Sequence, residues 1–215
     1  MSNIASEYYK KRPEFFHAMR NNCADAYLKL SQTYRRVTGN SRSEARNDEI
    51  NHNLAQLSAL HRGIEYRILK RCCYEAFILH DDIHKVMLVV KRESAIDMRR
   101  RDYDRFRKNW LAMLLKEVRN PEHKYKQLSW DEDFEDYVEP HKLLPEKYRD
   151  YTLLFVLHYG DVELNGMQII YTDERFEVLE RCDIDFVPEI SSKPEELVEL
   201  KLKGNLNVTK DRKKA

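Results

Sequence analysis

The feature that most constrains the fold of this chain is a long run of regularly spaced apolar residues between Ile50 and Val90. Their spacings of three, four or seven residues place side chains on one face of an α-helix. We therefore expect a single helix over residues 50–90, well beyond the mean of about 11 residues, and such a helix needs packing partners along its whole length. The residues that form the pattern are Ile50, Leu54, Leu57, Ile64, Ile68, Cys72, Ala76, Leu79, Ile83 and Met87.

Helix breakers are scarce in the first two thirds of the chain, where only Gly39 and Gly63 precede Gly160. Few glycines and prolines favour long helices. Proline is tolerated in the first turn of a helix, and glycine often follows the last turn. The further elements expected here are helices from Pro13, from Asn21 or Asn22 to Gly39 and over residues 96–119, with an exposed loop at residues 41–48.

The local pattern changes after Pro145, where short runs of β-prone residues replace the helical spacing. Asn165-Gly166 stands between two of these runs, which is a strong signal for a hairpin. The elements expected in this part are strands at residues 151–157, 162–164, 167–171, 176–179 and 186–187, followed by a helix from Pro194 to Gly204.

These patterns predict an α+β fold that is mainly α and consists of two unequal units. A long-helix bundle occupies residues 1–128, and a small β-rich domain occupies residues 150–208. An acidic, proline-bounded linker at residues 129–149 joins them, and a basic tail at residues 209–215 follows. Because this linker has few groups able to bury apolar area, we expect few contacts between the two units.

The composition excludes a strong overall electrostatic field. The 38 Lys and Arg residues nearly balance the 37 Asp and Glu residues, so the whole chain is not attracted to nucleic acid or to anionic lipid. No apolar run reaches the roughly 18 residues of a membrane span, and the N-terminus lacks a signal-peptide hydrophobic region. The 4 cysteines have no C-x-x-C spacing, so we expect reduced, mostly buried thiols inside the cell.

Motifs of the common enzyme classes are absent, including glycine-rich phosphate loops, the nucleophile elbow and the H-E-x-x-H pair. Two weaker metal patterns remain. His80 and His84 would share one helix face and could hold a divalent ion, while Glu49 and His52 have the spacing of a di-iron bundle. Further ligands are missing for both, and solvated surface residues account for them. We therefore expect no enzyme activity, no metal and no cofactor.

A basic cluster from Arg99 to Lys108 lies beside the aromatic residues Tyr103 and Phe106. Basic residues interleaved with aromatic ones could bind phosphates. Asp102 and Asp104 also lie inside this cluster. Their negative charges favour a helix face that meets an acidic protein surface instead.

An acidic run at residues 131–139 is accompanied by Trp130, Phe134 and Tyr137, which are larger apolar groups than solvation requires. A docking role for this segment is one interpretation, and a solvated loop is the other. The chain has 13 tyrosines, and tyrosine is favoured at interfaces because it buries a ring while its hydroxyl keeps a hydrogen bond. Together these features predict a protein that works by binding other proteins.

Several short motifs resemble the PSF-one family of GINS complex subunits. The stretch from Lys70 to Ile78 is similar to the basic-basic-Cys-x-x-Ala-aromatic-aliphatic motif in that family's long helix. A helical domain precedes a β-rich B domain in PSF-one and in its sister family SLD-five. Residues 172–185 look like an insertion in the B domain. The B-domain motifs, in order, are Val156-Leu157-His158-Tyr159-Gly160-Asp161, Asn165-Gly166, Phe186-Val187-Pro188, Glu196-Leu197-Val198 and Gly204-Asn205-Leu206.

The resemblance implies a non-catalytic subunit of a nuclear heterotetramer that joins the other GINS subunits through its helical domain. It implies binding to the minichromosome-maintenance helicase ring, the cell-division-cycle helicase cofactor and the leading-strand DNA polymerase, with DNA contacted only indirectly. The alternatives are an SLD-five subunit, a helical nucleic-acid-binding or scaffold protein that uses the basic cluster, and a small metal-dependent helical enzyme. The residues expected at protein interfaces are Arg71, Tyr74, Phe77, His80, Tyr103, Phe106, Trp130, Phe134, Tyr159 and Asp161.

Overall fold

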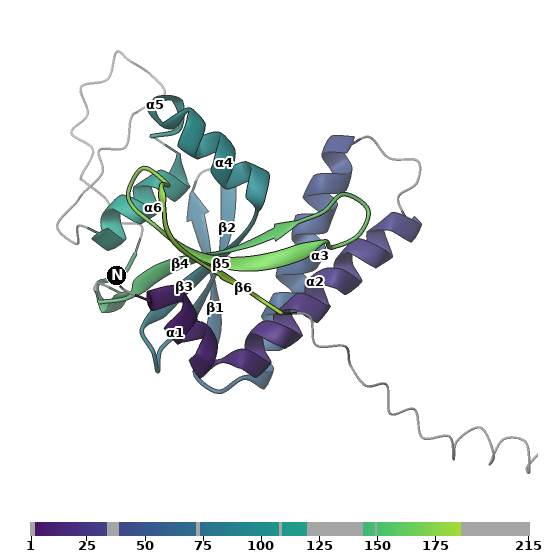
Figure 1. Ribbon diagram of the computed structural model, residues 1–215, viewed down its shortest axis with the longest axis horizontal. Helices are drawn as coiled ribbons and strands as arrows, with labels where there is room; N and C mark the ends of the chain where they lie inside the picture. The colour runs from purple at the N-terminus through teal and green to yellow at the C-terminus, as the bar shows by residue number, and fades with distance from the viewer. Residues whose placement is uncertain are drawn as a thin grey trace, which may run out of the picture.

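The computed structural model has three layers, in which helices cover both faces of one central sheet (Figure 1). It describes residues 3–33, 39–71, 74–107, 109–119, 144–148 and 150–185, apart from the side chains of residues 32–33, 39–43, 70–71, 74–75 and 119. None of the helices in these ranges is long and apolar enough to cross a membrane.

The first helical layer consists of α1 (Ile4–Lys11), α2 (Pro13–Thr33) and α3 (Gly39–Leu60). Proline is well suited to the first helical position, where its missing N–H would have no partner, and α2 begins at Pro13 as the sequence predicts. Helical spacing then places one apolar face of each helix against the sheet. The buried residues on these faces include Tyr8, Phe15, Phe16, Met19, Cys23, Tyr27, Ile50, Leu54 and Leu57.

In the described ranges the sheet has six strands, which follow the order of the sequence. Neighbouring strands are antiparallel except for β3 and β4, which are parallel. The connection between this parallel pair forms the second helical layer, as a parallel pair requires a crossover. The strands are β1 (Ile64–Arg71), β2 (Tyr74–Asp81), β3 (Val86–Arg92), β4 (Thr152–Tyr159), β5 (Gly166–Thr172) and β6 (Val178–Asp183), and the crossover contains α4 (Glu93–Arg101), α5 (Tyr103–Phe106), α6 (Trp110–Arg119) and the short 3₁₀ helix η1 (Glu146–Tyr148).

The two faces of the sheet contribute to two separate hydrophobic cores. Alternate residues of a strand point to opposite faces. In β3, Leu88 therefore packs toward α1–α3, whereas Val89 packs toward α4–α6. A strand covered on both faces is a continuous apolar run, which explains the sequence from Val86 to Val90 and its parallel partner from Leu153 to Leu157.

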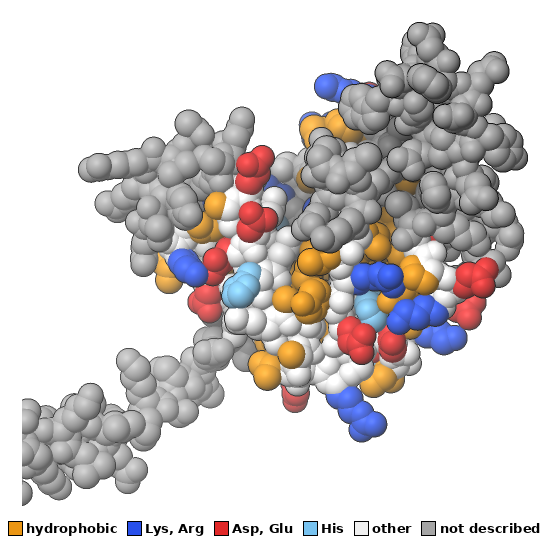
Figure 2. All heavy atoms as spheres, turned by 180° about the vertical axis from the view of Figure 1, so that it is seen from behind, with side chains coloured by type: hydrophobic (Ala, Val, Ile, Leu, Met, Phe, Trp, Pro, Cys, Tyr) orange, Lys and Arg blue, Asp and Glu red, His pale blue; other side chains and the backbone are white. Residues whose placement is uncertain are grey.

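The two edges of the sheet differ in their cover. At the β6 edge, the Glu180 carboxylate accepts hydrogen bonds from the backbone N–H groups of Ala5 and Ser6, which ties α1 to this strand. At the β1 edge, Tyr66 and Ile68 are 48% and 44% exposed. Figure 2 shows hydrophobic side chains gathered along the middle of this face, between charged groups on either side. Within the described ranges, β1 is therefore an edge strand with no further strand beside it, and it has an apolar flank.

The fold class predicted from the sequence is wrong: the chain is not a long-helix bundle followed by a β-rich domain. The expected helix over residues 50–90 ends at Leu60, and the rest of that segment forms β1, β2 and β3. The reason is that a spacing of four residues keeps side chains on one face of a strand as well as of a helix. Strands from both predicted units pair in one sheet, because β3 lies beside β4.

Other local predictions had mixed outcomes. The strands expected at residues 151–157 and 167–171 are confirmed as β4 and β5, while residues 162–164 form part of a loop. Residues 41–48, expected as a loop, belong to α3, and α2 runs unbroken past Asn22. The helix expected at residues 96–119 is divided into α4, α5 and α6. The strand at residues 186–187, the helix from Pro194 and the basic tail lie outside the described residues.

Candidate functional site

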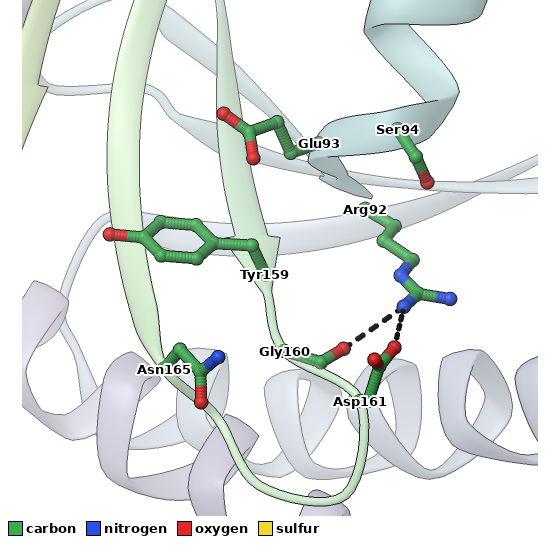
Figure 3. A pocket seen from close by; sticks show the side chains of 7 residues that line it. All are labelled: Arg92, Glu93, Ser94, Tyr159, Gly160, Asp161 and Asn165. Atoms are coloured by element: carbon green, nitrogen blue, oxygen red, sulfur yellow. Dashed lines mark hydrogen bonds and ion pairs between the residues drawn. The ribbon is translucent and has the colours of Figure 1, made fainter.

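A pocket lies at the carboxyl ends of the parallel strands. In α/β folds, ligands bind at the carboxyl ends of parallel strands, where the connections diverge. Here β3 leads directly into α4, and β4 leads into a loop at residues 160–165. Between them lies a pocket of about 230 Å³ (Figure 3). Its lining residues are Arg92, Glu93, Ser94, Tyr159, Gly160, Asp161 and Asn165.

Two glycines shape this pocket. Gly160 has a φ of +145°, and a Cβ atom there would lie 1.9 Å from the carbonyl oxygen of Glu163. At Gly166 a Cβ atom would lie 2.1 Å from the Tyr159 hydroxyl. These positions therefore need glycine, the first for the backbone conformation of the loop and the second for the placement of the Tyr159 ring.

The pocket carries both signs of charge. The Arg92 guanidinium donates to the Gly160 carbonyl oxygen at 3.0 Å and to Asp161 Oδ1 at 2.7 Å. The Glu93 carboxylate accepts from the Gln168 side chain at 3.1 Å. Figure 3 shows the Glu93 carboxylate and the Arg92 guanidinium on opposite sides of the opening. The arrangement can thus hold a ligand that has one positive and one negative end.

Uncharged polar groups complete the lining. In the described part of the chain, the Ser94 hydroxyl and the Asn165 side-chain amide have no hydrogen-bond partner. The α4 helix begins here without a side-chain cap, so the N–H groups of its first turn are free to donate.

A buried network supports the pocket from below. The Tyr27 hydroxyl and the His158 Nδ1 atom are 2.8 Å apart, and the Arg46 guanidinium lies 4.1 Å from the centre of the Tyr27 ring. Arg46 donates to the Asp161 carbonyl oxygen at 2.7 Å, which fixes the pocket loop. Burial, followed by the positive charges of Arg46 and Arg92, lowers the pKa of His158 to about 3. This histidine is therefore neutral near pH 7.

The opposite end of the strands holds a second polar cluster, centred on Asp81. Arg12 donates to both carboxylate oxygens, with Nε at 2.8 Å from Oδ2 and a terminal nitrogen at 3.1 Å from Oδ1. Oδ2 also lies 3.1 Å from the Tyr8 hydroxyl and 2.9 Å from His84 Nδ1. Burial alone would raise the pKa of Asp81, but the hydrogen bonds from Arg12 and His84 outweigh it and hold the pKa below its usual range.

His80 and His84, which were considered as a metal pair and set aside, contact different carboxylates. Because the segment is a strand and a turn rather than a helix, His84 contacts Asp81 while His80 contacts Asp82. Glu65, His80 and Asp82 have possible ligand atoms within 4.8 Å of one another. Both ring nitrogens of His80 are already engaged, with Nδ1 2.7 Å from Asp82 and Nε2 3.2 Å from the Tyr148 hydroxyl. We interpret this group as the polar anchor of η1 on β2.

Glu49 and His52, whose di-iron spacing was also set aside, have other contacts too. Both lie on α3, where Glu49 forms an ion pair with Lys29 at 2.5 Å. The His52 ring is 3.0 Å from the Gln56 side-chain nitrogen. No metal-binding group within the described ranges includes either residue.

The predicted interface residues are distributed over separate regions. Tyr159 and Asp161 lie together in the pocket. Phe77 stacks on Tyr66 in the β1–β2 pair, and His80 is buried on the opposite face of the same strands. Tyr103 and Phe106 belong to α5. Arg71 and Tyr74 end β1 and begin β2, but their side chains are not described, and Trp130 and Phe134 lie outside the described residues.

Sequence reasoning missed the pocket residues Arg92, Glu93, Ser94 and Asn165. The available signal was the passage from an apolar run into polar residues at Lys91, which marks the carboxyl end of a buried strand. Because residues 50–90 were interpreted as one helix, this signal was not recognised.

The comparisons with known proteins place the chain in a family. A family model described as a family of unknown function, DUF5986, matches residues 3–214. The chain belongs to DUF5986. No curated protein matches it, and no solved structure does.

Membership in DUF5986 corrects the predicted resemblance to GINS subunits, which is wrong. The motif from Lys70 to Ile78 lies across β1 and β2 instead of on a long helix. Its match was to residue types that suit a strand as well as a helix. The GINS, helicase and polymerase partners and the nuclear location were drawn from that resemblance and have no other support.

Proposed function

We propose that this protein binds a small zwitterionic ligand, such as a free amino acid, in the pocket at the carboxyl ends of β3 and β4. The observation that carries the proposal is the pairing of opposite charges across one opening, with Arg92 on one side and Glu93 on the other (Figure 3). A pocket of about 230 Å³ is smaller than the roughly 300–1,000 Å³ of clefts for drug-sized ligands. It therefore suits a small metabolite.

The roles of the lining groups follow from their charges. The ligand carboxylate lies toward Arg92, the Ser94 hydroxyl and the first turn of α4, where N–H groups and the helix dipole favour an anion. The ligand ammonium lies toward the carboxylate of Glu93. The Tyr159 ring and the Asn165 amide contact the rest of the molecule. Because Arg92 is held by Asp161 and Glu93 by Gln168, the charges are fixed before the ligand arrives.

The proposed role is binding without chemistry. Among the described residues, the pocket lining contains no cysteine, histidine or lysine, and no histidine contacts its serine, because His158 below the pocket is hydrogen-bonded to Tyr27. A nucleophile normally requires a base within hydrogen-bond reach. The sequence also lacks motifs of the common enzyme classes. We therefore propose that the protein is not an enzyme.

Isothermal titration of the full chain with a panel of amino acids tests this function. We expect saturable heat with at least one amino acid and none with its C-terminal amide, which lacks the carboxylate. Glu93→Gln and Ser94→Ala should each raise the dissociation constant about ten-fold, or roughly 1.4 kcal/mol. Glu174→Gln, an exposed carboxylate in the β5–β6 turn, is the matched control.

Any of three results would refute the proposal. One is the absence of heat with every amino acid while the protein remains folded. The others are equal binding of the amino acid and its amide, and preferential binding of a monosaccharide, because either would mean that the opposite charges do not select the ligand. Conversion of the ligand during the titration, followed by NMR, would instead show an enzyme.

A second candidate function is self-association through the open edge of β1, which retains the expectation that this protein works by binding proteins. An exposed edge strand presents unpaired backbone groups to another strand. Antiparallel pairing of two β1 strands about Ile68 would bring Ile68 of each copy together on one face. It would also place Glu65 opposite position 71, an arginine in the sequence. The occupant is thus a second copy of the chain.

The molar mass of the purified protein, measured by light scattering during size-exclusion chromatography, tests this association. We expect a dimer that Ile68→Lys converts to a monomer. Leu179→Lys is the control, because Leu179 is an exposed apolar residue on the opposite edge strand, β6. A monomer at all concentrations, or dissociation by both variants alike, would exclude the β1 interface.

A further inference from the structure

The layer of α4, α5 and α6 has an excess of positive charge that the whole chain lacks. Residues 93–119 contain eight Lys and Arg residues and five Asp and Glu residues, whereas the totals for the chain are 38 and 37. Lys91, at the end of β3, faces this same layer. The excess is therefore local and belongs to one side of the sheet.

Two of these cations, Lys91 and Arg99, are half-buried beside aromatic rings. The Lys91 ammonium lies 5.4 Å from the centre of the Trp110 ring, and the Arg99 guanidinium lies 5.7 Å from that of Phe106. Both distances fall within the roughly 6 Å at which a ring face attracts a cation. The rings hold both cations in place but do not neutralise their charge.

Neither cation has a carboxylate partner within the described ranges. Other arginines of this layer do, since Arg100 lies 3.3 Å from Asp97 and Arg105 lies 3.9 Å from Asp102. Arg99 instead donates to the Ala95 carbonyl oxygen in its own helix, and its Nε atom is buried without a hydrogen-bond partner. Burial, followed by the positive charge of Arg99, lowers the pKa of Lys91.

These contacts define an incomplete ionic site. Half-buried like charges repel each other, and a buried N–H without an acceptor adds a desolvation penalty. An anion between the two groups would remove both costs. A tetrahedral dianion matches the two positive charges and offers enough acceptor oxygens for the Nε atom and the ammonium group.

We propose that a phosphate group binds between Lys91 and Arg99, beneath α4 and beside Trp110. Lys91 contributes a point charge, while Arg99 donates from Nε and fixes the orientation of the phosphate. Lys91 and the pocket residue Arg92 are neighbours in β3, so their side chains point to opposite faces of the sheet. The phosphate is either inorganic phosphate or the phosphate ester of a nucleotide, since both present the same oxygens.

Trp110 supplies the readout for the test. In a Trp130→Phe background it is the single tryptophan, so its fluorescence reports on the site. Inorganic phosphate is titrated at constant ionic strength, and adenosine monophosphate is titrated in a parallel arm. We expect a saturable change with phosphate, and a lower dissociation constant in one arm identifies the preferred source. Sodium chloride at the same ionic strength should cause no change.

Three variants decide the outcome. Lys91→Met and Arg99→Met keep the apolar stems of the side chains and should each raise the phosphate dissociation constant at least ten-fold, whereas Arg100→Met, whose native partner is Asp97, should not. Without phosphate, Lys91→Met should raise the melting temperature, because it removes an unpaired charge. An unchanged affinity in both Met variants, an equal response to chloride, or a lower melting temperature of phosphate-free Lys91→Met overturns the proposal.

Discussion

At the amino ends of β3 and β4, both oxygens of the buried Asp81 carboxylate have hydrogen-bond donors. At the carboxyl ends, by contrast, the buried Nε atoms of Arg46 and Arg99 have no acceptor in the described part of the chain. Both ends therefore bury charge, but only one compensates it. Since most buried polar groups in native proteins are paired, the uncompensated end is where a ligand has a physical reason to bind.

The polar groups at the two ends of these strands also have different roles. The Asp81 cluster joins α1, α2 and the β2–β3 turn through Tyr8, Arg12 and His84. The carboxylate oxygens of Asp81 are therefore satisfied by contacts that hold the layers together. The carboxyl end has Arg92 and Arg46 fixing a loop, and it keeps donors and acceptors facing an opening. Substitutions at the two ends should therefore differ in kind, with losses of stability at one and losses of binding at the other.

The largest expected effect is at the compensated end. Asp81→Asn removes a negative charge that is 1% exposed, which leaves Arg12 without its partner. Breaking a buried ion pair costs about 3–5 kcal/mol, and we expect a loss of that size in urea unfolding. Asp183→Asn, an exposed carboxylate on β6, should change the unfolding free energy by less than about 0.5 kcal/mol. Equal losses in the two variants would show that Asp81 is not a centre of stability.

The next largest effect should be a pH dependence of the unfolding free energy, which comes from the uncompensated end. The folded pKa of His158 is about 3, below the ordinary value of about 6.5, so the unfolded chain binds more protons between these values. Stability from this group is then complete above about pH 6.5 and falls as the pH drops toward 3, by about 2 kcal/mol between pH 7 and pH 5. Urea unfolding across this range measures it.

The matched variant for the pH experiment is His158→Asn, whose side-chain oxygen can accept the Tyr27 hydroxyl. It should flatten the stability profile between pH 7 and pH 5. A profile with the same slope in the variant would assign the pH dependence to other groups.

A smaller effect on stability, with a large effect on binding, is expected for Gly166→Ala. The new Cβ atom would meet the Tyr159 hydroxyl at 2.1 Å, so the ring must move out of the pocket wall. We expect a loss of about 1 kcal/mol in unfolding free energy, typical of a steric adjustment by a side chain, together with loss of amino-acid binding. Retained binding at native affinity would show that the ring does not form the site.

The smallest effect on the unfolding free energy is expected for an exposed charge at the same end of the sheet as Asp81. Lys85 and Asp150 are 3.4 Å apart, and both side chains are exposed. Surface pairs contribute about 0–1 kcal/mol, so Lys85→Met should leave urea unfolding almost unchanged. A loss comparable to that of Asp81→Asn would mean that location, and not burial, determines the importance of charges at this end.

The candidate site was only partly predictable from the sequence. Tyr159 and Asp161 were singled out, and they do line the pocket. Their partner Arg92 is 69 residues away in the chain and reaches them because β3 and β4 pair in parallel. No local pattern specifies that pairing, since the connection between the strands passes through an entire layer of helices.

The sequence by itself determined those helices and strands whose local signal is compatible with only one type of secondary structure. Pro13 marks the start of α2, and the β-prone residues of β4 and β5 flank Asn165-Gly166. Only the tertiary structure decided the state of residues 64–92. Ile64 and Ile68 lie four residues apart and share a face in either a helix or a strand, so periodicity could not separate the two. Pairing with neighbouring strands and cover by helices on both faces select the strand, because they satisfy its backbone groups and bury its side chains together.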